Sequence, residues 1–274
     1  MTPAEILARF DAEMRIDPPP RPGVQYERVG NVVRGFGTWH AVVFARLTSA
    51  NADAAIAEQV AFFHAIANTA GARAIEWKVY GHDTPADLGS RLSAVGFEPD
   101  EPETLMVLDL AAPPRAGDAG AELSDATATP LGIDIRRVTG AAGLADLIAA
   151  GSAAFGRSEA EQMARIGREL SARLGDPALS LHVAYAAGRP VAGARLECPP
   201  ERSFAGLWGG GTIPEYRGRG IYRALVQTRA QEARRRGYRY LRVDARETSR
   251  PILERLGFVS LTRIIEWRLA LPPQ

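Results

Sequence analysis

The spacing of apolar positions changes repeatedly along the C-terminal half of the chain, which predicts alternating strands and helices. Residues 133–138 alternate apolar and polar side chains, as a half-buried strand does. Residues 141–155 and 158–174 repeat apolar side chains at helical spacing. Two apolar segments flank Gly188-Arg189-Pro190, which predicts a β-hairpin. The elements expected after it are a Gly-rich strand (204–213), a long helix (218–236), a strand (240–245), a short helix ending at 256 and a last strand (259–271).

These elements predict the fold class and the division of the chain. Hairpins mixed with strand–helix–strand units are typical of an α+β or α/β fold with a mixed sheet. Thr2, Pro3 and Glu5 predict a capped helix at the start of the chain. Residues 111–130 contain almost no large apolar side chain and cannot form a core. We therefore expect an N-terminal domain with its leading helix over 1–110, a linker over 111–130 and a C-terminal domain over 131–274.

The two halves of the chain show a weak internal similarity. Residues 70–79 resemble 236–243, and residues 92–97 resemble 253–258. In both halves the order is helix, Gly, strand, short helix, Gly-Phe and strand. Chance repetition of common αβ turn residues is the alternative, but the matching order favours a duplication.

Composition and charge exclude several classes of protein. The 274 residues are 46% hydrophobic and 24% charged, which is ordinary for a globular protein and excludes disordered, collagen-like and coiled-coil chains. A formal charge of +1 creates no general attraction to nucleic acids or membranes. The run Arg234-Arg235-Arg236 is better explained as a solvated helix end than as a nucleic-acid patch. We therefore expect neither nucleic acid nor membrane as a partner.

The single cysteine and the absence of long apolar runs add an expectation about location. Cys198 cannot form an internal disulfide, and no Cys/His spacing is typical of a zinc site. No stretch of about 18 apolar residues occurs. Charged residues also interrupt the first segment, which argues against a secretory signal. These features predict a cytoplasmic protein. For the oligomeric state, the expectation stays open between a monomer and a homodimer.

The segment 209–225 carries the strongest chemical signal. Three successive glycines, Gly209–Gly211, predict a bulge or a close approach to the end of a strand. Pro214 ends that strand, and Arg217-Gly218-Arg219-Gly220 opens a helix. The unpaired N–H groups and the dipole at a helix start, together with two arginines, favour a phosphate or diphosphate. The P-loop and Rossmann motifs are both absent, although a P-loop-like nucleotide binder remains a third hypothesis.

This segment resembles the GNAT superfamily of acyl-CoA-dependent N-acetyltransferases. The family carries Arg/Gln-x-x-Gly-x-Gly/Ala between a strand and a helix, and residues 217–222 fit it except that Tyr222 replaces a small residue. Residues 251–258 resemble a second hallmark, a short helix ending in Leu-Gly-Phe. The resemblance covers 131–272 and implies a GNAT fold. The N-terminal half resembles a degenerate second copy, which implies two tandem copies.

The resemblance implies acetyl-CoA as the cofactor. The strand ending at Thr212 and Ile213 would pair with the pantetheine arm, and the amides of residues 218–222 would hold the diphosphate. The side chain of Tyr222 either points away from the phosphates or reaches into the acceptor pocket. The residues implied in cofactor binding are Thr212, Ile213, Arg217, Gly218, Arg219, Gly220, Ile221, Tyr222 and Ser249.

Acetyl transfer to an amine sets three chemical requirements. A lysine-like amine has a pKa of ~10.4, so a base or a desolvated pocket must provide its neutral form. The developing oxyanion needs an N–H donor, and the leaving thiolate accepts a proton. The family often supplies that proton from a Tyr, but Leu253 occupies the matching position. The candidate bases are Glu197, Asp244 and Glu247, whereas Tyr222, Tyr216 and water are the candidate acids.

The sequence thus predicts an N-acetyltransferase that transfers an acetyl group from acetyl-CoA to an amine by direct attack on the thioester. A small molecule or a peptide would carry the amine. The alternative is a non-catalytic acyl-CoA-binding regulatory module, because Leu253 and Tyr222 depart from the family pattern. His182, in an apolar segment, is better explained as a buried hydrogen-bonded histidine than as a catalytic residue.

Overall fold

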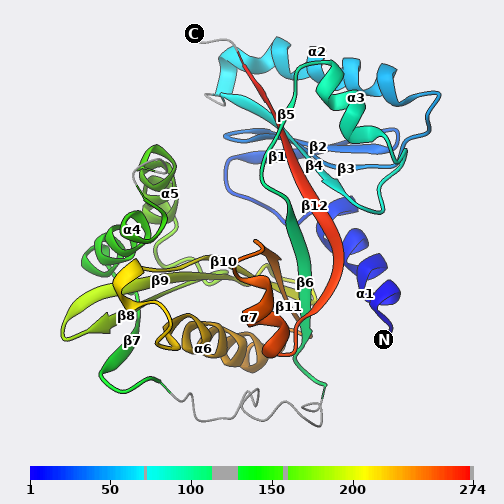
Figure 1. Ribbon diagram of the computed structural model, residues 1–274. Helices are drawn as coiled ribbons and strands as arrows, with labels where there is room; N and C mark the ends of the chain where they lie inside the picture. Colours follow the sequence, from blue (N-terminus) through cyan, green and yellow to red (C-terminus); the bar gives the residue numbers. More distant parts are fainter. Residues whose placement is uncertain (71–72, 113–128, 157–159, 272–274) are drawn as a thin grey trace. The chain divides into compact units, whose positions relative to one another are not determined.

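The chain forms two compact units, and each combines segments that are distant in sequence (Figure 1). The computed structural model describes residues 1–70, 73–112, 129–156 and 160–271, except for the side chains of 68–70 and 160–162. Unit 1 contains Met1–Met106, Asp244–Arg250 and Val259–Gln274, and unit 2 contains Val107–Val243 and Pro251–Phe258. Most of the predicted linker, residues 113–128, lies outside the described residues.

Unit 1 is built on a sheet with the strand order β1-β2-β3-β4-β12-β6, with β5 paired to β12. β3 and β4 run parallel, whereas β12 is antiparallel to β4. The last strand of the chain therefore completes the sheet of the N-terminal unit. The elements of unit 1 are α1 (Pro3–Phe10), the π-helix η1 (Asp11–Ile16), β1 (Val24–Val29), β2 (Val32–Gly37), β3 (His40–Ala45), α2 (Ala52–Ala70), β4 (Ala74–Tyr80), α3 (Leu88–Ala94), β5 (Glu98–Pro99), β12 (Val259–Ala270) and the start of β6 (Glu103–Asp109).

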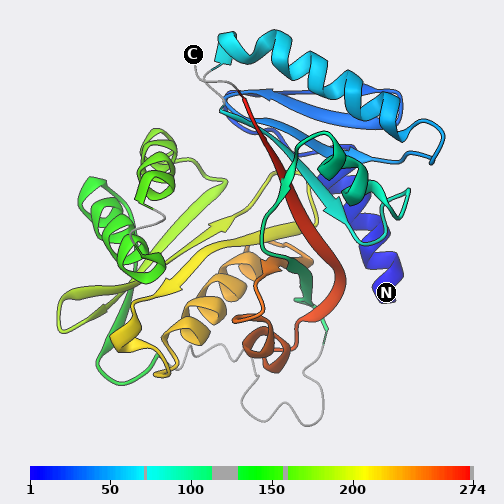
Figure 2. The same cartoon turned by 45° about the horizontal axis from the view of Figure 1, so that its top comes forward.

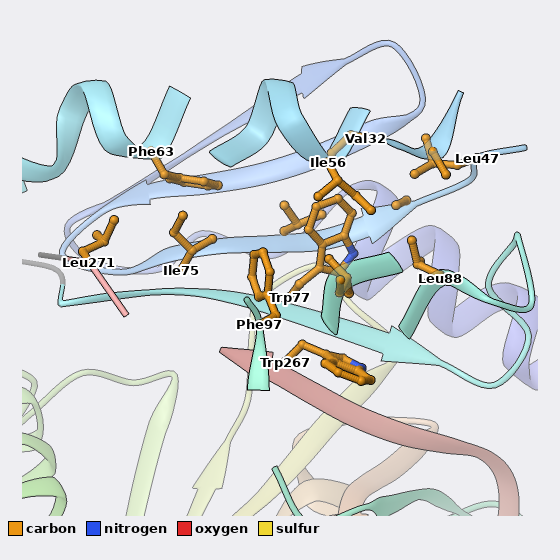
Figure 3. Close-up of a cluster of buried hydrophobic side chains, with 14 of the residues drawn as sticks. Val32, Leu47, Ile56, Phe63, Ile75, Trp77, Leu88, Phe97, Trp267 and Leu271 are labelled. Carbon is orange, nitrogen blue, oxygen red and sulfur yellow. The ribbon is translucent and has the colours of Figure 1, made fainter. Parts of the chain in front are cut away.

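One apolar cluster forms the core of unit 1. Ile56 and Phe63 project from α2 toward the strands, where they meet Ile75 and Trp77 of β4 (Figure 3). Trp267 of β12 belongs to the same buried cluster. The burial of such large side chains supplies the main stabilising free energy of this unit, roughly 1.5–3 kcal/mol for each.

The N-terminal helix is attached to unit 1 through a buried charge. The predicted capping box is confirmed, because Thr2 accepts from the Glu5 amide and Glu5 accepts from the Thr2 amide. Beyond α1, the buried Arg15 donates to both carboxylate oxygens of Asp83, at 2.9 and 2.7 Å, and to Asp11 at 2.7 Å. Two carboxylates thus offset the cost of burying this guanidinium.

Unit 2 has the strand order β6-β11-β10-β9-β8-β7. Helices α4 and α5 lie on one face of β8–β10, and α6 lies on the other (Figures 1 and 2). β10 is parallel to β11 and antiparallel to β9. The elements of unit 2 are β7 (Ile133–Arg137), α4 (Ala141–Phe155), α5 (Ala160–Ala172), β8 (Leu179–Ala186), β9 (Arg189–Glu197), β10 (Phe204–Thr212), the 3-10 helix η3 (Pro214–Tyr216), α6 (Ile221–Arg235), most of β11 (Tyr240–Ala245) and most of α7 (Arg250–Arg255).

The predicted duplication is visible in the turns that follow α3 and α7. The Phe97 amide donates to the Leu92 carbonyl at 3.1 Å, and the Phe258 amide donates to the Leu253 carbonyl at the same distance. The glycine before each phenylalanine has a positive φ, +97° at Gly96 and +86° at Gly257. Both halves therefore close the short helix in the same way. The observed fold is a mixed α+β fold, as predicted.

Two details concern individual helices. α6 begins at Ile221, three residues later than predicted, because Gly218 and Gly220 have positive φ angles and keep the backbone out of the helix. The predicted start of the preceding helix, at residue 158, lies outside the described residues. Among the helices that the structure describes, none has both the length and the apolar character to cross a membrane.

Candidate functional site

The predicted disruption of the Gly-rich strand is a β-bulge. Trp208 of β10 lies opposite Arg195 of β9, but the next opposed pair is Gly211 and Gly193. Gly209 and Gly210 therefore lie opposite the single residue Ala194. Gly209 has φ +57°, a conformation that glycine adopts without steric cost. The bulge bends the strand and changes the direction in which its backbone N–H groups point.

β10 also separates from its parallel neighbour. Its pairing with β11 covers only Phe204–Gly206, opposite Tyr240–Arg242. Pairing with β9 continues to Thr212. The second half of β10 thus has a ladder on one edge and no β11 ladder on the other. An extended ligand could pair with such a strand edge through backbone hydrogen bonds.

The bend between β10 and α6 exposes the start of a long helix. Arg217–Gly220 are exposed, and Gly220 is the N-cap of α6 with φ +78°. No side chain caps this helix, and its first backbone bond runs from the Ala224 amide to the Gly220 carbonyl at 3.0 Å. The amides of the first turn therefore point out of the helix without an intrahelical acceptor. This geometry suits an anion, because the N–H groups and the helix dipole act together.

The two arginines of the bend are held by backbone carbonyls. Arg217 donates to the carbonyls of Thr212 and Ala154, at 3.1 and 3.0 Å. Arg219 donates to the Glu215 carbonyl at 3.2 Å, and its guanidinium lies 4.7 Å from the centre of the Tyr216 ring. Neither arginine is in an ion pair with a described carboxylate, so both leave positive charge at the bend.

The glycines of the bulge allow close approach from both faces of the sheet. A Cβ at Gly210 would lie 3.0 Å from the ring of Tyr222, which comes from α6. A Cβ at Gly211 would lie 2.9 Å from the ring of Phe155, which comes from α4. The Tyr222 side chain, whose direction the sequence left open, therefore packs against the bulge on the α6 face.

The base candidate in unit 2, Glu197, is engaged in ion pairs. Its carboxylate lies 3.2 Å from Arg173 and 3.6 Å from Arg195. Leu253, at the position where the family often has a tyrosine, is fully buried in α7. His182 is buried too, with Nε2 3.4 Å from the Glu232 carboxylate. This agrees with the structural explanation of His182.

The remaining candidates belong to unit 1. The side chain of Asp244 is 3% exposed, and its carboxylate lies 2.5 Å from Nζ of Lys78. Burial lowers the pKa of Lys78, but the charge of Asp244 outweighs it and raises that pKa above its usual value. Glu247 pairs with Arg250, the first residue of α7, at 3.0 Å, and Ser249 donates to the Arg246 carbonyl at 3.0 Å. These three residues lie in the segment Asp244–Arg250, which directly follows the part of β11 that belongs to unit 2.

Two further charged residues, the partly buried Glu103 and the buried Arg229, were not anticipated. Glu103 lies beside the Lys78–Asp244 pair, and burial raises the pKa of its carboxyl to about 7. Arg229 of α6 is 1% exposed and contacts the bulge. Only one feature of the sequence indicated that Arg229 is buried: it lies one turn after Leu225, on the apolar face of the helix.

Comparison with known proteins agrees with this description. Residues 147–258 match the model of the Acetyltransferase (GNAT) family. A GCN5-related N-acetyltransferase from Kribbella flavida has a similar structure, with a TM-score of 0.65, 14% identity and coverage of 99% of this chain and 96% of that chain. A functionally unknown conserved protein from Staphylococcus epidermidis ATCC 12228 has a TM-score of 0.67 at 14% identity, with coverage of 92% of this chain and 95% of that one.

A third similar structure also covers most of this chain. It is a tandem GNAT protein from the clavulanic acid biosynthesis pathway, with a TM-score of 0.60, 15% identity and coverage of 93% of this chain and 86% of that chain. No curated protein sequence matches the chain. At these identities the structural likeness establishes the fold. The match to the GNAT family covers residues 147–258, and along its length the chain has the fold of a tandem GNAT protein.

Proposed function

We propose that this protein is an acetyl-CoA-dependent N-acetyltransferase, and that the bend between β10 and α6 binds the diphosphate of the cofactor. The observation that carries the proposal is the exposed, uncapped start of α6 directly after a bulged strand. The family match over residues 147–258 supports the reaction class. The acceptor would be an amine on a small molecule or a peptide.

The residues of the bend fit a diphosphate. Gly218 and Gly220 both have positive φ angles, and a Cβ at Gly218 would meet no atom within 4 Å. The first-turn amides, including those of Ile221 and Tyr222, would donate to phosphate oxygens. Arg217 and Arg219 would add positive potential while their carbonyl partners hold them in place.

The bulged part of β10 fits the arm and the acyl group. Beyond Gly206, the β10 edge that faces away from β9 would donate to and accept from the amides of the pantetheine arm. Bound acetyl-CoA supplies the acetyl group as a thioester. Backbone N–H groups near Thr212 would donate to the acyl oxygen as negative charge develops on it.

Both carboxylates considered as bases for the amine already have cationic partners. Glu197 would have to exchange an arginine partner for the amine, and Asp244 is paired with Lys78. We therefore propose that a water or the desolvated pocket assists the amine, with Glu197 and Asp244 as the side-chain candidates. For the leaving thiolate, whose reference pKa is about 8.5, Tyr222 is the proposed proton donor.

One observation favours a second function, a non-catalytic acyl-CoA-binding module. The buried Leu253 offers no hydroxyl where the family often has its acid. Calorimetry with acetyl-CoA, together with CoA release from a panel of amines, separates the two functions. The panel would include arylamines, polyamines, amino sugars and peptide N-termini. The single cysteine is buried, so a thiol reagent would report released CoA with little protein background.

Each outcome of this experiment has a distinct meaning. Binding with CoA release that depends on one class of amine supports the transferase. Binding without release on any amine supports the module. Absence of binding overturns the assignment of the bend.

A further inference from the structure

Arg229 is a buried cation whose partners are carbonyl oxygens. Its side chain is 1% exposed, on the face of α6 that packs against the sheet. Among the residues that the structure describes, Arg229 has no ion pair with an Asp or Glu. Burial lowers the pKa of its guanidinium to about 10, so it still carries a full charge at neutral pH. A charge in such a position costs several kcal/mol unless polar groups compensate it.

The compensating groups lie at the bulge of β10. Nη1 of Arg229 donates to the carbonyl of Arg195 on β9 at 3.0 Å and to the carbonyl of Trp208 on β10 at 3.5 Å. These two residues form the last opposed pair before the strand registers shift. Nε donates to the Leu225 carbonyl at 3.0 Å, which fixes the guanidinium to its own helix. One side chain thus joins α6 to both strands where the bulge begins.

The guanidinium also reaches the middle of the bulge. A Cβ at Gly210 would lie 3.4 Å from Nη2 of Arg229 and 3.0 Å from the ring of Tyr222. The charge therefore lies directly beneath the residues that turn the strand backbone. A bulge interrupts the regular ladder, and a planar fork of donors is well suited to satisfy carbonyls that the ladder no longer pairs.

Stability alone does not account for an arginine at this position. Replacing a buried charged group by an apolar side chain of similar volume is often neutral or stabilising. A fork that bonds two strands at once, however, restricts the bulge to one shape. The same bulge is the part of β10 that we assign to the acyl oxygen.

We propose that Arg229 is a positioning residue, which holds the β10 bulge in the shape that presents its backbone N–H groups to the acyl group. The inference rests on the proposed function for its catalytic consequence. Its structural part concerns only β9, β10 and α6 and can be tested without a ligand.

The experiment compares Arg229→Met, Arg229→Lys and the control Arg235→Met. Arg235 is exposed on the same helix, and the structure gives it no ion pair among the described residues. Hydrogen exchange of the amides of residues 208–212, without ligand, reports the shape of the bulge. We expect exchange to be at least about 10-fold faster in Arg229→Met, intermediate in Arg229→Lys and unchanged in the control.

Kinetics then test the catalytic consequence. With an amine that the wild type accepts, kcat of Arg229→Met should fall by about 100-fold, while KM for acetyl-CoA changes less than about threefold. A structural role alone would lower the thermal midpoint without this split between kcat and KM. If Arg229→Met does not fold, the same comparison of kcat and KM in Arg229→Lys tests the inference. A lysine keeps the positive charge but lacks the planar set of donors of a guanidinium.

The outcomes distinguish this inference from the proposed function. Unchanged exchange at 208–212 in a folded Arg229 variant overturns it, and so does unchanged kcat. If the wild-type protein releases no CoA with any amine of the panel, both the proposed transferase activity and the catalytic role of Arg229 are overturned. In that case the exchange result still decides whether Arg229 holds the bulge.

Discussion

The ring of Tyr222 occupies the space that a side chain at Gly210 would need. A Cβ at residue 210 would lie only 3.0 Å from Cε2 of Tyr222. This distance is shorter than ordinary van der Waals contact between carbon atoms, which is about 3.5–4.0 Å. The bulky residue that departs from the family motif is thus accommodated by a glycine on the neighbouring strand.

Gly210→Ala should therefore destabilise the protein by about 1–3 kcal/mol through overpacking. In the double variant Gly210→Ala/Tyr222→Ala, the ring that clashes with the new Cβ at residue 210 is removed. The loss in free energy of unfolding should therefore be about 1 kcal/mol smaller than the sum of the losses in the two single variants. Urea unfolding of the four proteins measures this coupling. Gly140→Ala is the control, because a Cβ there meets no atom within 4 Å. Additive effects at 210 and 222 would show that the two residues do not compete for space.

Gly220→Asp should abolish acetyl-CoA binding, or weaken it by at least about 100-fold. A carboxylate at the helix start would repel the diphosphate and compete for the same amides. Gly188→Asp is a matched control, since Gly188 has φ +79° against +78° at Gly220 and open space around it. Calorimetry measures both affinities, and circular dichroism checks the folds. Equal affinity in the two variants would refute the position of the diphosphate.

Glu103→Gln should remove a pH dependence of stability. The pKa of Glu103 is raised from its usual 4.5 to about 7 by burial and by Asp244, although Lys78 opposes this shift. Its protonated form therefore stabilises the folded state below pH 4.5, and this contribution is lost as the pH rises through 7. The glutamine variant should gain roughly 1–2 kcal/mol over the wild type at pH 8 and much less at pH 5.

Thermal unfolding of Glu103→Gln and wild type from pH 5 to pH 8 measures this difference. The exposed neighbour Glu101 provides the control substitution, Glu101→Gln. A constant difference between Glu103→Gln and wild type across this range would show that Glu103 titrates at its ordinary pKa.

Glu232→Gln should destabilise unit 2 most at neutral pH, by about 1–3 kcal/mol. Burial alone would raise the pKa of Glu232, but His182, Ser180 and Arg236 together lower it to about 2. Its charged form therefore stabilises the fold above pH 4.5, and this contribution disappears as the pH falls toward 2. Denaturant unfolding between pH 3 and pH 7 measures how the free energy of unfolding changes with pH. Glu201→Gln, at an exposed position of the same unit, should leave the slope as it is in the wild type.

Local sequence signals determined most of the secondary structure. The helix predicted over 141–155 is α4, Ala141–Phe155, and Thr2 and Glu5 form the expected capping box. The glycines of the 209–211 run form the expected bulge. Such features depend on residues within a few positions of one another, so periodicity, caps and positive-φ glycines suffice to predict them.

Only the tertiary structure decided which distant residues meet. Alternation places Asp244 on one face of its strand, but nothing local indicates Lys78, which lies 166 positions away in sequence, as its partner. The sequence did not predict the pairing of β12 with β4 for the same reason. The hydrogen bonds between two strands join backbone groups, so they do not depend on the identity of the side chains. The role of Arg229 could not be predicted from the sequence either. Helical periodicity predicts which face of the helix a residue lies on, but not which backbone carbonyls of a neighbouring strand it contacts.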